Sequence, residues 1–149
     1  MPTCTDRFIN PFTDFGFKRI FGEEPNKDIL IDFLNTIFRG EFYIKELSLK
    51  SPFKTNKTKE ERKAVFDLYC TTQKDERIII EMQKAKQKYF KDRSVFYSTF
   101  PIQEQAQSGE WDYKLSAVYT VGILDFVFDD ENKDKPIVQE IKLIDTKTQ

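Results

Sequence analysis

The chain has 149 residues, the length of one domain, and its 24 Lys and Arg residues against 25 Asp and Glu residues give a formal net charge of -1. This balance excludes a histone-like polycation, although it leaves room for the local basic patches that bind nucleic acids. The chain contains no histidine, which excludes Ser-His-Asp and Cys-His catalysis and most zinc sites, so any metal ion must be held by oxygen atoms.

The cysteines and the apolar segments bear on where the protein is located. Cys4 and Cys70 are far apart and match no zinc-site spacing, so we expect two reduced thiols, with Cys70 buried in a strand. The N-terminus lacks the apolar run of a signal peptide, and no apolar segment approaches the roughly 20 residues that a membrane span needs. We therefore expect a cytoplasmic protein without a membrane contact.

The first 40 residues predict two helices. In the first, Thr13 is a candidate N-cap and Gly22 marks the end. In the second, Asn26 is a candidate cap and Gly40 marks the stop. Apolar residues recur at helical spacing in both segments: Phe17, Ile20 and Phe21 in the first, and Ile29, Leu30, Phe33, Leu34 and Ile37 in the second.

The middle of the chain predicts strands. Residues 43–50 indicate a short strand, and residues 51–63 are polar and cationic, which is typical of a loop. Two further strands are expected at about 64–71 and 77–83, around the polar turn 72–76.

The C-terminal half predicts a helix and two more strands. The helix begins near Asp92, with a kink or restart expected at Pro101. Residues 114–126 are apolar on both faces, which favours a central strand covered on both sides, and residues 137–145 predict a last strand. The sequence thus predicts a single α/β (α+β) domain over residues 1–149, with a mixed central sheet flanked by helices in the order α-β-β-β-α-β plus an extra C-terminal strand.

The two middle strands each carry one acid among apolar neighbours. If the turn is centred near Lys74, Asp67 lies directly opposite Glu81, and opposed Cβ atoms are about 4.5–5.5 Å apart. Two carboxylates at that distance repel each other by roughly 3 kcal/mol at an effective dielectric constant of 20. A protonated carboxyl, a Lys or Arg between the acids, or a bound divalent cation could offset this repulsion.

Oxygen ligands without imidazole favour Mg²⁺ or Mn²⁺ as the cation. Gln83 lies two residues after Glu81, so its amide is expected on the same face of the sheet. The alternative is that Asp67 and Glu81 lie on a solvated face and pair with surface lysines, a pattern that apolar-polar alternation often produces.

Residues 9–22, 62–70, 78–94 and 104–126 together resemble the PD-(D/E)XK nuclease-like transposase family, also called recombination-promoting nucleases. The resemblance spans nearly the whole chain. It implies a restriction-endonuclease-like core, and it implies that the chain lacks the C-terminal region of the family.

The resemblance also implies roles for individual residues. Asp67 and Glu81 match the two acids that bind the metal ion, and Glu81 is also expected to contact the attacking water. Gln83 stands where the broader superfamily usually has a lysine, and a glutamine there can only orient water and donate a neutral hydrogen bond. Asp14 matches a further catalytic carboxylate, and Lys18 follows one helical turn later, although a surface ion pair explains these two residues equally well.

A basic cluster follows Gln83 directly. Because this cluster lies next to the acidic strand, we expect it to contact the DNA backbone and to make DNA binding sensitive to salt. The alternative is a solvated basic surface at the start of a helix. The expected DNA-binding residues are Lys18, Lys84, Lys86, Lys88 and Arg93, and the family motif has an arginine at the position of Arg93.

These observations predict a magnesium-dependent DNA endonuclease that hydrolyses phosphodiester bonds in transposition or recombination. The alternatives are a catalytically inactive nuclease-fold module for DNA binding or assembly, and a fragment that needs its C-terminal region for activity. DNA is the expected partner. A last strand at the edge of the sheet could also pair between chains, which would give a homodimer.

Overall fold

The computed structural model of the chain describes residues 8–50, 66–127, 136–143 and 147. The four strands found in these ranges form one sheet in the order β1-β2-β3-β4, in which β1, β2 and β3 pair antiparallel and β4 runs parallel to β3. The elements are α1 (Asp14–Phe21), the short 3₁₀ helix η1 (Glu24–Asn26), α2 (Lys27–Ile37), β1 (Leu47–Lys50), β2 (Leu68–Thr72), β3 (Arg77–Gln83), α3 (Phe90–Glu104) and β4 (Val118–Leu124).

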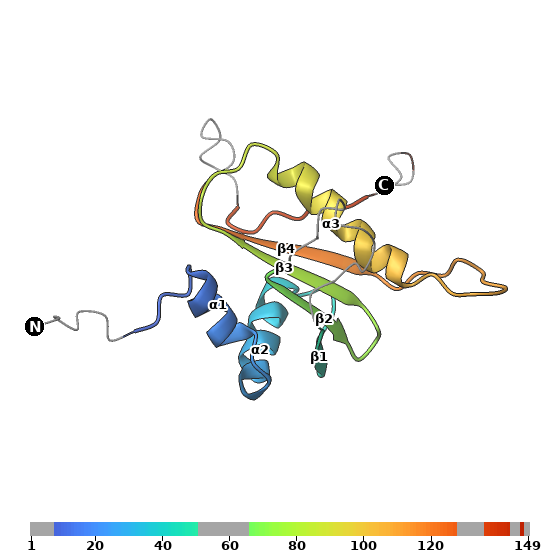
Figure 1. Ribbon diagram of the computed structural model, residues 1–149, viewed down its shortest axis with the longest axis horizontal. Helices are drawn as coiled ribbons and strands as arrows, with labels where there is room; N and C mark the ends of the chain where they lie inside the picture. Colours follow the sequence, from blue (N-terminus) through green and yellow to red (C-terminus); the bar gives the residue numbers. More distant parts are fainter. Residues whose placement is uncertain (1–7, 51–65, 128–135, 144–146, 148–149) are drawn as a thin grey trace, which may run out of the picture.

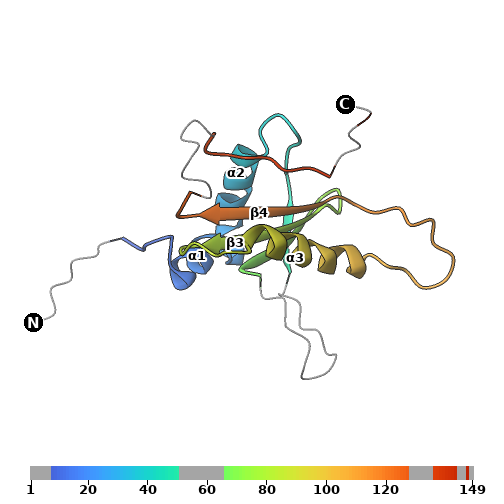
Figure 2. The same cartoon turned by 90° about the horizontal axis from the view of Figure 1, so that it is seen from above.

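Helices cover both faces of the sheet (Figures 1 and 2), because β3 is apolar on both sides. Alternate side chains point to opposite faces, so Ile78 and Ile80 pack with residues of α1 and α2, whereas Ile79 packs with Phe66 and Tyr69 under α3. Helix α3 connects β3 to its parallel neighbour β4, as a crossover between parallel strands requires. Glu81 has the same parity as Ile79 and therefore belongs to the face under α3.

The local signals in the first helix are confirmed. Thr13 has an extended backbone, and its Oγ1 accepts a hydrogen bond of 3.0 Å from Gly16 N, which satisfies one of the N–H groups left open at a helix start. Helix α1 ends before Gly22, as predicted, and its Phe17 is buried against the sheet. Helix α2 buries Leu30 and Leu34 in the same core.

The predicted hairpin is confirmed as β2 and β3, with the turn at residues 73–76. β2 begins at Leu68, later than expected, and residues 51–65 lie outside the described residues, so the cationic loop prediction is not addressed there. Cys70 is a buried free thiol, whereas Cys4 lies outside the described part of the chain.

Two expectations for the C-terminal half need correction, and a third is decided in part. Helix α3 continues through Pro101 to Glu104 without a restart, which leaves the kink as a prediction, and the ring of Pro101 is fully buried. β4 is an edge strand of the described sheet and not a central one, although both of its faces are covered. Residues 137–143 form no strand: their apolar side chains are exposed and add nothing to the core, so no burial drives pairing with the edge of β4.

Candidate active site

Asp67 lies directly before β2, where the chain enters the sheet. The pairing of β2 with β3 aligns Leu68 with Ile80, and one step further along the same register Asp67 faces Glu81. Asp67 Oδ2 accepts a hydrogen bond of 2.7 Å from Met82 N. Burial raises the pKa of the Asp67 carboxyl, while the bond from Met82 and the positive charge of Lys18 act in the opposite direction.

Glu81 lies on β3 and is only 6% exposed. Its Oε2 is 3.5 Å from Arg93 Nη2, whereas its buried Oε1 has no hydrogen-bond partner among the described residues. Burial raises the pKa of Glu81 to about 7; the negative charge of Asp67 adds to the increase, and Arg93 opposes it. A buried carboxyl oxygen without a partner is costly, and this one lies beside a second acid.

Gln83 has hydrogen bonds at both ends of its side-chain amide. Its Oε1 accepts a bond of 2.9 Å from Arg93 Nη2, and its Nε2 donates a bond of 3.1 Å to the carbonyl oxygen of Ala85. The two bonds together orient the amide oxygen toward the guanidinium.

Helix α3 brings Arg93 to this site from its first turn. The guanidinium also donates to Gln87 Oε1, and its central carbon lies 5.4 Å from the ring centroid of Phe90 and 5.7 Å from that of Tyr97. Stacking on two rings restricts a long side chain that would otherwise be mobile. One of the counter-charges considered for the acid pair, a basic side chain, is therefore present beside Glu81.

A glycine allows α3 to lie close to β4 at the level of Glu81. Gly122 pairs with Glu81 across the parallel strands. A Cβ atom at Gly122 would lie 2.8 Å from Phe90 Cζ, closer than carbon atoms pack. The missing side chain thus leaves room for Phe90, which is buried and supports the guanidinium of Arg93.

Asp14 and Lys18 form an ion pair of 2.6 Å on α1, and both side chains are largely exposed. This is the surface pair considered for them above. The charges of both residues nevertheless affect the pKa of Asp67, so α1 lies on the Asp67 side of the site. No group of three or more His, Cys, Asp or Glu side chains could hold a metal ion within the described residues. A role of Asp14 as a further carboxylate stays a prediction.

The lysines after Gln83 lie in the connection between β3 and α3. Lys84, Lys86 and Lys88 are all exposed, and Lys88 Nζ lies 5.2 Å from the ring centroid of Tyr89. This connection joins the end of β3 that carries Gln83 to the end of α3 that carries Arg93. DNA contacts by these lysines stay a prediction.

Sequence reasoning missed Tyr97 as a member of the site. Burial raises the pKa of Tyr97, and the negative charges of Glu81 and Asp67 add to this increase, while Arg93 lowers it. The signal was present, because Tyr97 follows Arg93 by four residues on one helix and therefore shares its face.

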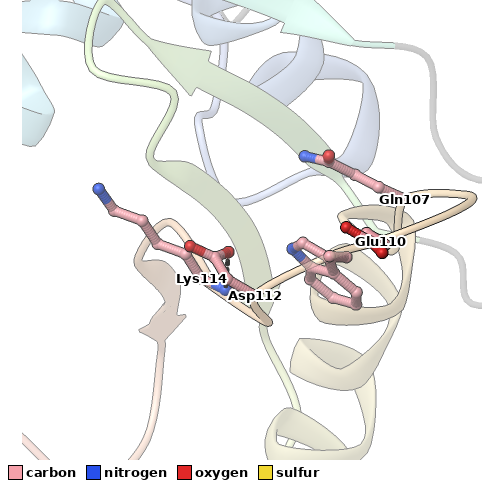
Figure 3. Close-up of a pocket in the computed structure, with 5 residues that line it drawn as sticks. Gln107, Glu110, Asp112 and Lys114 are labelled. Carbon is pink, nitrogen blue, oxygen red and sulfur yellow. Dashed lines mark hydrogen bonds between the residues drawn. The ribbon is translucent and has the colours of Figure 1, made fainter.

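A hollow of about 630 Å³ lies elsewhere on the molecule, in the loop between α3 and β4 (Figure 3). This loop follows the C-terminal end of α3, whereas Arg93 lies in the first turn of the helix, so the hollow is remote from the acid pair. Its lining consists of Gln107, Glu110, Trp111, Asp112 and Lys114.

A helix, a three-stranded antiparallel meander, a crossover helix and a parallel fourth strand define a restriction-endonuclease-like core, with facing acids at the hairpin. The chain belongs to the PD-(D/E)XK nuclease family transposases, since the family model of that description matches residues 11–149. No curated protein and no solved structure matched in the same comparisons. In the described residues, no helix has the length and apolar character needed to cross a membrane.

Proposed function

We propose that the protein is a metal-dependent DNA endonuclease that hydrolyses phosphodiester bonds in transposition or recombination. The observation that carries this proposal is the buried Oε1 of Glu81, which has no hydrogen-bond partner within the described part of the chain and lies beside a second acid that faces it across the hairpin. Membership of a nuclease family supports the same conclusion.

The residues fit a hard divalent cation. Asp67 and Glu81 offer only oxygen atoms, which Mg²⁺ and Mn²⁺ prefer, and a cation would give Glu81 Oε1 the partner that the described residues do not supply. When bound, such an ion polarises the phosphate and lowers the pKa of a coordinated water. Asp67 and Glu81 would hold the ion, and the low exposure of Glu81 strengthens the electrostatic interactions of the site.

The remaining residues would place the DNA. Lys84, Lys86 and Lys88 can neutralise backbone phosphates beside the acid pair, which brings a scissile phosphodiester to the site without reading its sequence.

Nicking of supercoiled plasmid DNA tests the proposal. We expect nicking that requires Mg²⁺ or Mn²⁺ and is lost in Asp67→Asn and in Glu81→Gln, because each change removes a charged ligand. Asp32→Asn, an exposed acid on α2, is the matched control and should nick like the wild type. Circular dichroism verifies that the variants are folded. A wild type that binds no divalent cation at millimolar concentration would refute the proposal.

The second candidate is a catalytically inactive nuclease-fold module that binds DNA or assembles. The contact between Arg93 and Glu81 favours it, because a guanidinium already compensates part of the negative charge without a metal ion. This candidate predicts salt-dependent DNA binding in a gel shift that Asp67→Asn and Glu81→Gln leave unchanged, together with no nicking by the wild type.

A further inference from the structure

The two carboxylates of the acid pair repel the negatively charged phosphodiester that the proposed reaction must bring beside them. Hydrolysis of a phosphodiester joins a water oxygen to phosphorus and breaks one P–O ester bond. One proton of the water goes to the leaving oxygen and the other to solvent. The non-bridging oxygens carry negative charge throughout, and two carboxylates beside them oppose their approach. A fixed positive group within reach of the same space would lower this barrier.

Arg93 is the basic side chain that contacts Glu81 among the described residues. Its Nη2 lies between Gln83 Oε1, at 2.9 Å, and Glu81 Oε2, at 3.5 Å. The side chain of Arg93 is 27% exposed, whereas that of Glu81 is 8% exposed, so the guanidinium lies on the solvent side of the acid. A substrate that approaches from solvent would meet it there.

Gln83 determines where this positive charge lies. Because its Nε2 donates to Ala85 O, its Oε1 is the end of the amide that points to the guanidinium. The amide oxygen therefore accepts from Arg93, and the water-orienting role of Gln83 stays a prediction because the same oxygen has a second lone pair.

We propose that Arg93, positioned by Gln83, is the catalytic cation that stabilises the charge of the reacting phosphodiester. This inference rests on the proposed function and assigns the role of each residue within that site. Arg93 touches the phosphate and is a catalytic residue, whereas Gln83 acts through it and is a positioning residue.

Relocation of the charge tests the assignment. Arg93→Gln removes the cation, and we expect kcat for nicking to fall roughly 10²–10³-fold, as when one charge-stabilising donor is removed. The double variant Gln83→Lys/Arg93→Gln places an ammonium on the neighbouring position of β3, and it should recover about tenfold or more of that loss. Arg39→Gln, an exposed arginine after α2, is the charge-matched control and should not change kcat.

Measuring how Arg93→Gln changes kcat and DNA affinity separately distinguishes this role from a simple contact with the DNA backbone. A ground-state phosphate contact would weaken DNA binding and reduce the slope of its salt dependence by about one in Arg93→Gln. The proposed role predicts instead that the dissociation constant for DNA without divalent metal changes less than about threefold, while kcat falls. Gln83→Ala should lower kcat in the wild-type background and have no further effect in Arg93→Gln.

A second measurement needs no turnover. Because the guanidinium repels a cation at the same acids, Mn²⁺ binding measured by calorimetry should tighten roughly threefold or more in Arg93→Gln and weaken again in the double variant. An Arg93→Gln variant with unchanged kcat and unchanged Mn²⁺ affinity overturns the inference, and so does a loss of kcat that Gln83→Lys does not restore in a folded double variant. If the wild type neither nicks DNA nor binds Mn²⁺, the proposed function itself fails and the inference fails with it.

Discussion

At the scale of single residues, the site is a balance between a buried acid and the charges around it. Glu81 is buried by the sheet, its Oε1 has no hydrogen-bond partner among the residues that the structure describes, and its Oε2 contacts Arg93. Asp67 is stabilised differently, by the N–H of Met82. The facing of the two acids follows from strand alternation and the turn position, so the sequence was sufficient to predict it. The contact with Arg93 joins residues of a strand and a helix, and only tertiary packing defines it.

The raised pKa of Glu81 predicts a pH-dependent stability in the absence of metal. The pKa is about 7 in the folded state against an ordinary value of 4.5, so between pH 4.5 and 7 the folded state holds the proton more firmly than the unfolded state. The free energy of unfolding of the wild type therefore falls as pH rises through this window, by at most about 3 kcal/mol from Glu81. Asp67 contributes in the same direction.

Urea denaturation in EDTA at pH 4.5, 7 and 8 measures this effect. We expect Glu81→Gln to lose this part of the pH dependence and to gain stability relative to the wild type as pH rises. Glu110→Gln changes an exposed acid and should follow the wild-type curve. Identical curves for Glu81→Gln and the wild type would mean that Glu81 ionises as an exposed glutamate does.

At the scale of elements, signals within a segment gave reliable predictions and pairing between segments did not. The Thr13 cap and the β2–β3 turn are local, and both were confirmed. The α2 periodicity is also local, and it was confirmed except at Ile29, which is 50% exposed. The edge position of β4 and the absence of a strand at residues 137–143 depend on which partners are available in space. Apolar residues on both faces of a segment indicate that both faces of the strand are packed against other elements. An edge strand can be packed in this way as well as a central one.

The close approach of α3 to β4 predicts the effect of a single methyl group. Gly122→Ala places a Cβ 2.8 Å from Phe90 Cζ, so the ring of Phe90 must shift. We expect a loss of about 1–3 kcal/mol in the free energy of unfolding, typical of overpacking, and a reduction of nicking because the Arg93 guanidinium lies over that ring. Phe90→Leu/Gly122→Ala relieves the contact and should regain part of the stability. Wild-type stability and nicking in Gly122→Ala would show that α3 tolerates displacement.

At the scale of the whole molecule, the formal net charge is only -1, so any electrostatic attraction of a polyanion depends on where the charges lie on the surface. Membership of the PD-(D/E)XK nuclease family transposases implies a polyanionic substrate, which a nearly neutral protein binds only through a local basic surface. The exposed lysines Lys84, Lys86 and Lys88 lie in the connection between β3, which carries Glu81, and α3, which carries Arg93. A homodimer through a sheet edge stays a prediction.

Two triple variants with the same net charge separate local from global electrostatics. Lys84→Gln/Lys86→Gln/Lys88→Gln removes the lysines beside the site, and Lys45→Gln/Lys74→Gln/Lys114→Gln removes three exposed lysines from other loops. If Lys84, Lys86 and Lys88 contact DNA, the first variant should reduce the slope of the logarithm of the DNA-binding constant against the logarithm of the salt concentration by about three. The reason is that each lost phosphate contact releases one fewer counterion. The second should keep the wild-type slope. Fluorescence anisotropy across a salt series measures the slope for each variant. Equal slopes for the two variants would show that overall charge determines DNA binding and that Lys84, Lys86 and Lys88 do not contact the DNA.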